Sequence, residues 1–176
     1  MNTDSNIYPI GTFTPITSFD LKQVNQWIQE IAILPKDLKI LCGGRSLELL
    51  STPLRPNAWS LRQLIHHIAD SHHHSYTRFK WALTENTPLI KAYDEVAWSV
   101  LADADAPIEL SLAHLSAIHG KWVYLLENMT EADFCKQFQH PASMNYQFLY
   151  NTLGSYAWHG KHHLAQLENA FNKSVI

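Results

Sequence analysis

The sequence predicts an all-α protein, a four-helix bundle with one long crossover connection. Apolar residues recur at helical spacing in four long segments, and residues that cap or begin helices stand before them. No segment alternates apolar and polar residues as a half-buried strand does. With 176 residues, the chain is long enough for one sizeable core but short for two. We therefore expect residues 1–176 to form a single domain.

The composition is typical of a folded protein that does not bind nucleic acid. Hydrophobic residues make up 46% of the chain and charged residues 16%, which excludes a disordered or highly charged chain. The net charge of −3 provides no basic surface for phosphates. No apolar stretch reaches the roughly 20 residues of a membrane-spanning helix, and residues 1–10 lack the features of a secretory signal. Cys42 and Cys135 alone cannot form a disulfide framework, so we expect a cytoplasmic protein. Because no apolar stretch is long enough to span a membrane, we expect no membrane partner.

The first helix is predicted to follow an extended, proline-containing start. Thr17 or Ser18 is a suitable N-cap, and the helix is expected to run to about Leu34. Pro35 favours a first-turn position, so it is expected to begin a further helical piece that ends at 43–44.

The second helix has the clearest boundaries. Ser60 and Gln63 form a capping box, with Trp59 before them as a possible hydrophobic staple. No proline or glycine interrupts the segment before 87–88. Its helical stripe consists of Leu61, Leu64, Ile65, Ile68, His72, Tyr76 and Phe79.

The remaining chain is predicted to supply the crossover and two more long helices. Residues 88–106 form the connection, with a short helix over 93–98. Pro107 suits the first turn of the third helix, which ends near Asn128. The fourth helix covers 149–171 and tolerates two internal glycines at some cost in stability.

Histidine is the unusual component, with 11 copies that gather at 66–74 and 159–163. On a helical wheel, His67 lies on the flank of the apolar stripe of the second helix. The same construction places His163 on the inner face of the fourth helix and His159 on its flank. The residues predicted to face solvent are His66, His73 and His162, and Asp70 is expected to face solvent or to lie at an interface.

His159 and His163 have a spacing that suits one metal ion, because residues four apart share a helix face. Gly160 and Lys161 stand where a zinc protease of the H-E-x-x-H type carries its general base, so that activity is excluded. A third imidazole from a facing helix would complete an open catalytic site, and His67 is the best-placed donor. The alternative is that these histidines are simply solvated, which would leave inward-facing rings without partners.

Three further residues have two interpretations each. His72 and His119 lie on inner faces, so each either orients a ligand imidazole or is a core histidine bonded to a backbone carbonyl or a tyrosine. Arg78 shares the flank of His67 and either pairs with a carboxylate of a small anionic molecule or forms a surface salt bridge.

Segments 55–85, 93–98 and 156–167 resemble the DinB-like metal-binding four-helix bundles, most closely their YfiT branch of bacillithiol transferase-like proteins. The resemblance covers nearly the whole chain. It implies that His67, His159 and His163 hold the metal, the same three residues that the wheel selects. It also implies a homodimer.

We therefore expect one divalent metal ion per chain, zinc or nickel, because three neutral imidazoles suit either ion. The resemblance favours an S-transferase whose partners are a low-molecular-weight thiol, similar to bacillithiol, and an electrophile. A hydrolase that uses metal-bound hydroxide needs the same ligands and is the alternative. A non-catalytic metal-binding protein would also show this site.

Overall fold

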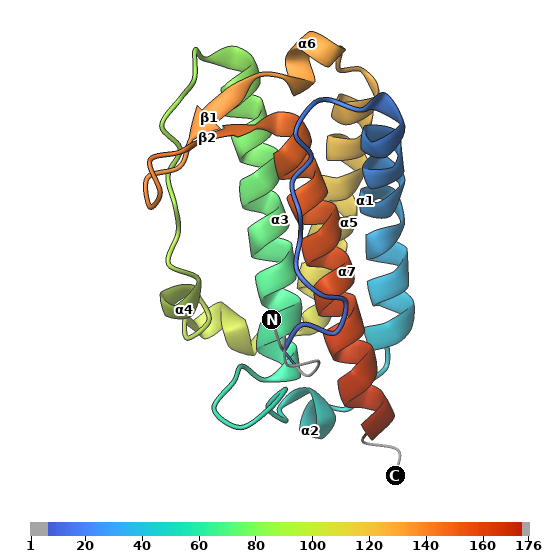
Figure 1. The fold of residues 1–176 in the computed structure, drawn as a ribbon. Coiled ribbons are helices and arrows are strands. Elements are labelled where there is room, and N and C mark those ends of the chain that lie inside the picture. Colours follow the sequence, from blue (N-terminus) through green and yellow to red (C-terminus); the bar gives the residue numbers. More distant parts are fainter. Residues whose placement is uncertain (1–6, 174–176) are drawn as a thin grey trace.

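The computed structural model describes residues 7–173 and contains four long helices that lie side by side (Figure 1). The long helices are α1 (Leu21–Cys42), α3 (Leu61–Thr84), α5 (Ile108–Glu127) and α7 (Leu149–Lys173). Both α1 and α3 pack against α5 and against α7. This arrangement confirms the predicted four-helix bundle, and it places the two histidine-rich helices, α3 and α7, in contact.

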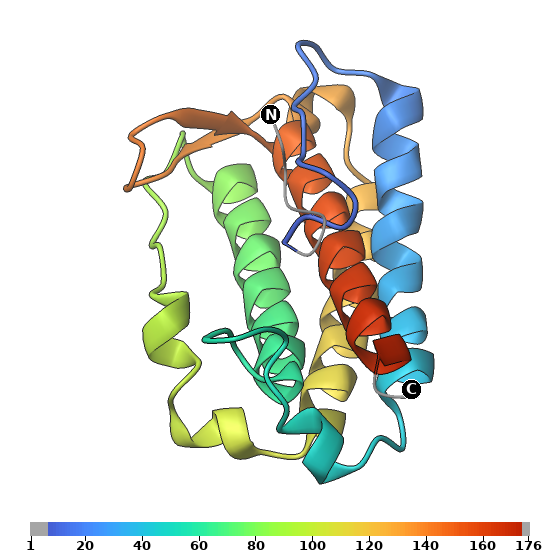
Figure 2. The same cartoon turned by 60° about the horizontal axis from the view of Figure 1, so that its bottom comes forward.

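Short elements connect the long helices. They are α2 (Leu47–Leu50), α4 (Glu95–Trp98), the 3-10 helix η1 (Ala102–Asp105), α6 (Glu131–Phe134), β1 (Gln137–Gln139) and β2 (Tyr146–Phe148). Figures 1 and 2 show the segment with α4 and η1 returning along the outside of α3 before α5 begins. As a result α3 and α5 run in the same direction while α1 and α7 run in the opposite one. The predicted crossover over 88–106 is therefore confirmed.

Helix α1 differs from its prediction at both ends. Asp20, rather than Thr17 or Ser18, is the N-cap, and its carboxylate accepts hydrogen bonds from two backbone N–H groups of the first turn. The helix does not break at Pro35 but continues to its end as one element, with the proline ring buried in the bundle. A proline inside a helix lacks the N–H that would bond the carbonyl four residues earlier. That carbonyl belongs to Ile31, and it acquires a different partner.

A small hairpin between α6 and α7 was not predicted. Its strands pair antiparallel, with Gln137 opposite Phe148, and residues 140–145 form its turn. Strands of three residues are too short to show an alternating pattern. The hairpin also contacts the start of the crossover, where Leu89 bridges Gln139.

The core consists of two apolar clusters. The first cluster contains Val24, Trp27, Ile28, Ile31, Phe79, Ala82, Ile90, Trp122, Leu126, Phe134, Phe138, Leu149, Tyr150, Leu153 and Ala157. The second contains Leu34, Leu38, Cys42, Leu50, Leu61, Leu64, Ile65, Ile68, Ala69, Ile108, Leu112, Leu115, Leu167 and Phe171. On α7, His159, His162 and His163 lie between the residues of the two clusters, and on α3 His72, His73 and His74 do so, while His66 and His67 lie beside residues of the second cluster. None of the helices within residues 7–173 has the length and apolarity that crossing a bilayer requires.

The two glycines of α7 are explained by its close approach to α1. A Cβ at Gly154 would lie 2.6 Å from the indole of Trp27, and a Cβ at Gly160 would collide with Leu34. Glycine lowers the intrinsic stability of the helix, but at these two positions it allows α7 to pack closely against α1.

Candidate metal centre

Three histidine rings meet where α3 faces α7. The Nε2 atom of His159 lies 3.2 Å from Nε2 of His67 and 3.1 Å from Nε2 of His163. One nitrogen from each of the three rings lies within 4.8 Å of the others. The structure thus brings together the three residues that the sequence selects.

The spacing of these nitrogens suits a shared ion. Histidine nitrogens bind zinc at about 2.0–2.1 Å, so two of them at a tetrahedral angle lie about 3.3 Å apart. The separations of 3.1 and 3.2 Å around His159 are close to this value. Three protein ligands leave a further coordination position for a reactant.

Burial keeps the three rings uncharged. Loss of solvent lowers the pKa of His67 to about 4 and that of His163 to about 3. The pKa of His159 is lowered well below its usual value, first by burial and then by the neighbouring histidines. Neutral imidazole is the form that binds metals, so the site is prepared for a cation at neutral pH.

A chain of hydrogen bonds fixes the orientation of His159. Its Nδ1 lies 3.2 Å from Nε2 of His72, and Nδ1 of His72 lies 2.9 Å from Nε2 of His119. Nδ1 of His119 is 2.6 Å from the carbonyl oxygen of Ile31. A carbonyl oxygen can only accept, so His119 donates to it through Nδ1–H. In neutral rings, His72 then donates through Nδ1–H to Nε2 of His119, and His159 donates through Nδ1–H to Nε2 of His72.

Because Nδ1 of His159 carries the proton, its Nε2 has a free lone pair, and this atom faces the rings of His67 and His163. The chain of hydrogen bonds also explains the partner of Ile31. Because Pro35 has no N–H to offer, the Ile31 carbonyl is free of its usual helical bond and accepts from His119 instead. Both interpretations of His119 therefore apply, since it is a buried histidine bonded to a backbone carbonyl that also stands behind a candidate ligand. His72 is buried too, but its two partners are His159 and His119 and not a carbonyl or a tyrosine.

His163 is oriented separately by Gln166, one turn further along α7. Nδ1–H of His163 donates to Oε1 of Gln166 at 2.9 Å, while the Gln166 amide donates to the carbonyl of Ile7 at 2.9 Å. The second bond fixes which end of the amide accepts, so Nε2 of His163 also carries a lone pair. Sequence reasoning missed Gln166, although its position three residues after a candidate ligand was a usable signal.

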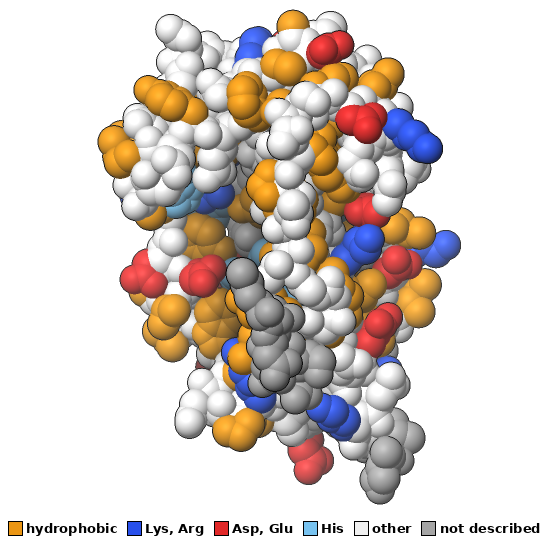
Figure 3. Space-filling model, viewed as in Figure 1, with side chains coloured by type: hydrophobic (Ala, Val, Ile, Leu, Met, Phe, Trp, Pro, Cys, Tyr) orange, Lys and Arg blue, Asp and Glu red, His pale blue; other side chains and the backbone are white. Residues whose placement is uncertain are grey.

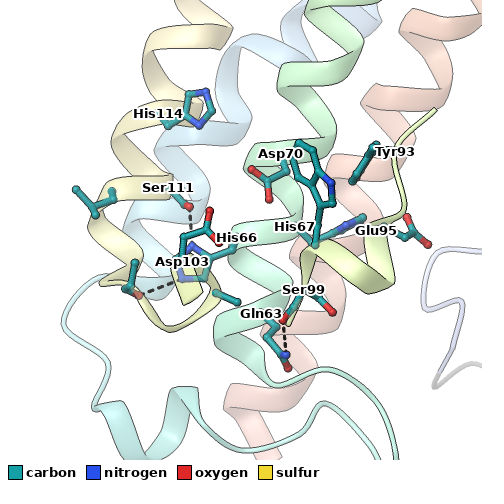
Figure 4. A pocket seen from close by; sticks show the side chains of 14 residues that line it. Gln63, His66, His67, Asp70, Tyr93, Glu95, Ser99, Asp103, Ser111 and His114 are labelled. Carbon is teal, nitrogen blue, oxygen red and sulfur yellow. Dashed lines mark hydrogen bonds between the residues drawn. The ribbon is translucent and has the colours of Figure 1, made fainter. Parts of the chain in front are cut away.

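A first cavity of about 190 Å³ opens beside His67 (Figure 4). Asp70, Tyr93 and Glu95 are among the residues that line it. Asp70 is half-buried there, which corrects the expectation that it faces solvent and leaves the interface alternative as a prediction. Burial, followed by the nearby Asp103, raises the pKa of Asp70.

A second, larger cavity of about 820 Å³ is lined by His159. Arg78 and Tyr156 line it beside His159, and Tyr93 and Glu95 of the crossover border both cavities. On the face drawn in Figure 3, histidine atoms are visible within a hollow of the surface. Two neighbouring cavities therefore adjoin the three-histidine group, one at His67 and one at His159.

Two further predictions of exposure were wrong. His66 is buried, and its ring bonds Ser111 Oγ at 2.7 Å and the carbonyl of Ala106 at 3.1 Å. His162 is buried as well, stacked on Trp158 with ring centroids 4.8 Å apart. The helical wheel could not anticipate that η1 and the segment before α1 cover these faces. His73 is exposed, as predicted.

Comparison with known proteins gives consistent matches over most of the chain. The model of the DinB superfamily matches residues 26–167. A protein of Bacillus subtilis named "Putative metal-dependent hydrolase YfiT" is 44% identical over 161 residues, which cover 91% of this chain and 90% of the relative. A Bacillus pumilus protein named "Putative metal-dependent hydrolase" is 41% identical over 167 residues, 95% of each chain.

The solved structure of YfiT from Bacillus subtilis superposes with a TM-score of 0.94 at 41% identity, covering 97% of this chain and 98% of that one. That structure is also a four-helix bundle, of a topology described as unusual. The parallel pair α3 and α5 and the external crossover are the features of this chain that depart from a simple up-and-down bundle. From its sequence and its fold, the chain belongs to the DinB superfamily.

Proposed function

We propose that this protein is a metal-dependent enzyme that holds one divalent ion, zinc or nickel, on His67, His159 and His163. We further propose that it activates a low-molecular-weight thiol for transfer to an electrophile. One observation carries the metal site. The hydrogen bonds of His159 and His163 leave a lone pair on each Nε2, and these two atoms lie 3.1 Å apart. Two lone pairs at that distance on half-buried rings repel each other, and a cation between them turns this repulsion into attraction.

The chain's own residues would hold and orient the reacting groups. His72 and His119 keep the ring of His159 in one tautomer, and Gln166 does the same for His163. The residues of the two apolar clusters pack on the inner faces of the helices that carry the three histidines, and they keep water from those faces. A bound zinc or nickel ion supplies a Lewis acid that lowers the pKa of a thiol or a water at its open position.

The two cavities favour a reaction between two molecules. His67 lines one cavity and His159 lines the other, so there is room for a thiol and an electrophile next to the same centre. In transfer, the sulfur of the thiol forms a bond to the electrophile as the leaving group departs. The sulfur first loses its proton to solvent water, because the thiolate is the nucleophile.

Hydrolysis is the second candidate, and the names of the relatives favour it. It needs the same three ligands but consumes water in place of a thiol. Substrates that give a detectable product only with added thiol therefore separate the two reactions.

The experiment measures metal content and thiol conjugation on the same preparation. Untagged protein is expected to contain about one equivalent of metal by plasma emission spectroscopy. It is expected to conjugate monochlorobimane with at least one member of a thiol panel that includes bacillithiol and glutathione. His163→Ala should lose both properties, whereas His73→Ala, an exposed histidine of α3, should keep both.

Less than a tenth of an equivalent of metal would contradict the metal site. Equal conjugation rates for the wild type and His163→Ala would contradict thiol transfer, and thiol-independent cleavage of ester or amide substrates would favour the hydrolase. The predicted homodimer is a separate matter that light scattering on a sizing column decides.

A further inference from the structure

Arg78 carries a buried positive charge at the wall of the second cavity. Only 8% of its surface is exposed, and it lines this cavity together with His159 and Tyr156. Its Nη1 donates to the hydroxyl of Tyr156 at 3.1 Å, while its buried Nε has no hydrogen-bond partner. The ion pairs found within residues 7–173 do not include Arg78.

This arrangement is unusual because a guanidinium stays charged at any accessible pH. Burial of a charge is unfavourable unless an opposite charge or several hydrogen bonds compensate it. Tyr156 offers a neutral oxygen, so it compensates only in part. The free Nε–H belongs to the planar fork with which arginine binds the two oxygens of a carboxylate.

The surroundings of Arg78 leave its charge available to a ligand. Glu95 also borders the cavity, but it is exposed on the crossover and forms no ion pair with Arg78 among the described residues. The pKa of His74 falls to about 4, first through burial and then through the charge of Arg78. His140, on the same cavity, has its pKa lowered by the same two causes in the same order.

The position of Arg78 relates it to the candidate metal centre. Tyr156, which accepts its hydrogen bond, has its ring centroid 5.6 Å from that of His159. An anionic group held by the guanidinium would therefore lie within the length of one small molecule from the three histidines.

We propose that Arg78 binds a carboxylate of the substrate, so that the thiol activated at the three histidines is a carboxylic acid. This inference rests on the proposed function for the identity of the thiol, but the carboxylate site itself does not depend on the reaction. Arg78 is thus a determinant of substrate specificity, and the surface salt bridge considered from the sequence is absent from the described residues.

The test uses the cobalt-loaded full-length protein, in which a bound thiolate gives a charge-transfer absorption band. Two probes are titrated, 3-mercaptopropionate and its neutral amide, 3-mercaptopropionamide. The acid is expected to bind the wild type at least tenfold more tightly than the amide, as a charge-assisted fork predicts. In Arg78→Met this preference should fall to about twofold or less.

Matched variants show whether the effect belongs to Arg78. Arg62→Met removes another arginine of α3, which pairs with Asp105, and should leave the preference unchanged. Arg78→Lys keeps the charge without the fork and should give an intermediate preference. If Arg78→Met does not fold by circular dichroism, Tyr156→Phe is used, which removes the hydroxyl that holds Nη1 and should reduce the preference two- to threefold.

The outcomes separate this proposal from the proposed function. If both thiols bind but the acid has no advantage, or the advantage survives in Arg78→Met, the carboxylate site is overturned and thiol activation stands. If neither thiol produces the band, thiol activation is contradicted. Calorimetry with propionate and propionamide then decides the carboxylate site, because propionate should still bind the wild type more tightly than Arg78→Met.

Discussion

His67, His72, His119, His159 and His163 form a group that we call the histidine layer. This layer and the two apolar clusters are held together by different kinds of interaction. In the first cluster, Phe79 and Trp122 are fully buried and pack edge to face with ring centroids 5.3 Å apart. Such packing depends on volume and tolerates many substitutions of similar size. In the layer, His72 is also fully buried, but both of its nitrogens have a specific partner. The clusters therefore determine whether the chain folds, and the layer determines where three ring nitrogens point.

This difference matters because a polar network is a costly way to fill a bundle. Apolar residues of similar volume often replace buried polar groups without loss of stability. The chain instead joins three buried histidines, His67, His72 and His119, to the half-buried His159 and His163 through short contacts between ring nitrogens. We expect stability and metal affinity to respond separately to substitutions in the two regions.

The largest effect should come from the apolar side. Phe79→Ala removes a fully buried ring and should lower the free energy of unfolding by about 3–5 kcal/mol, measured by denaturant titration. The variant that still folds should bind one equivalent of metal. The exposed Lys80→Ala on the same helix is the control and should change neither quantity. Loss of metal binding in a folded Phe79→Ala would show that the two regions are not independent.

The second effect concerns the layer. Zinc at one hundred times its dissociation constant should stabilise the wild type by about 2.7 kcal/mol, because it binds the folded state alone. His67→Ala should lose this stabilisation while the metal-free stability stays close to that of the wild type. Thermal unfolding with zinc and with a chelator measures both values. Equal stabilisation of the variant and the wild type would remove His67 from the site.

These two regions also differ in how far the sequence predicted them. Helical periodicity gives the inner face of each long helix, which was enough to select His67, His159 and His163. It does not say which other segments cover a face, so the burial of His66 beneath η1 was missed. It also cannot match groups on different helices, and the bond from His119 to Ile31 depends on how α5 sits against α1.

The third effect tests the hydrogen bonds behind His159. His119→Leu keeps the volume of the ring but removes the donor to Ile31 and the acceptor for His72. Loss of a group that orients a ligand imidazole costs 10- to 100-fold in metal affinity, and we expect the lower end because His72 remains. Competition with a chromogenic chelator measures it. His114→Leu, on the surface of α5, should have no effect on affinity.

The same variant should alter the dependence of stability on pH. Burial lowers the pKa of His119 to about 4 in the folded protein, whereas the unfolded chain has the ordinary value near 6.5. Between these values the unfolded state binds more protons, so the contribution of His119 is fully present above pH 6.5 and is lost as the pH falls toward 4. In the metal-free protein, His119→Leu should therefore flatten the loss of stability between pH 6.5 and 4. An unchanged slope would mean that His119 is not buried as a neutral ring.

The smallest effect should come from Pro35, which lies in α1 and contacts none of the candidate ligands through a hydrogen bond. Pro35→Ala restores an N–H that competes with His119 for the carbonyl of Ile31. We expect metal affinity to fall only a few-fold, because a carbonyl oxygen has two lone pairs and can accept from both donors, although with less favourable hydrogen-bond angles. The helix itself should gain stability, so affinity and stability change in opposite directions. Lys36→Ala, at the exposed position that follows, is the control and should change neither affinity nor stability. If Pro35→Ala binds metal as tightly as the wild type, the free carbonyl of Ile31 is not needed to orient the histidines.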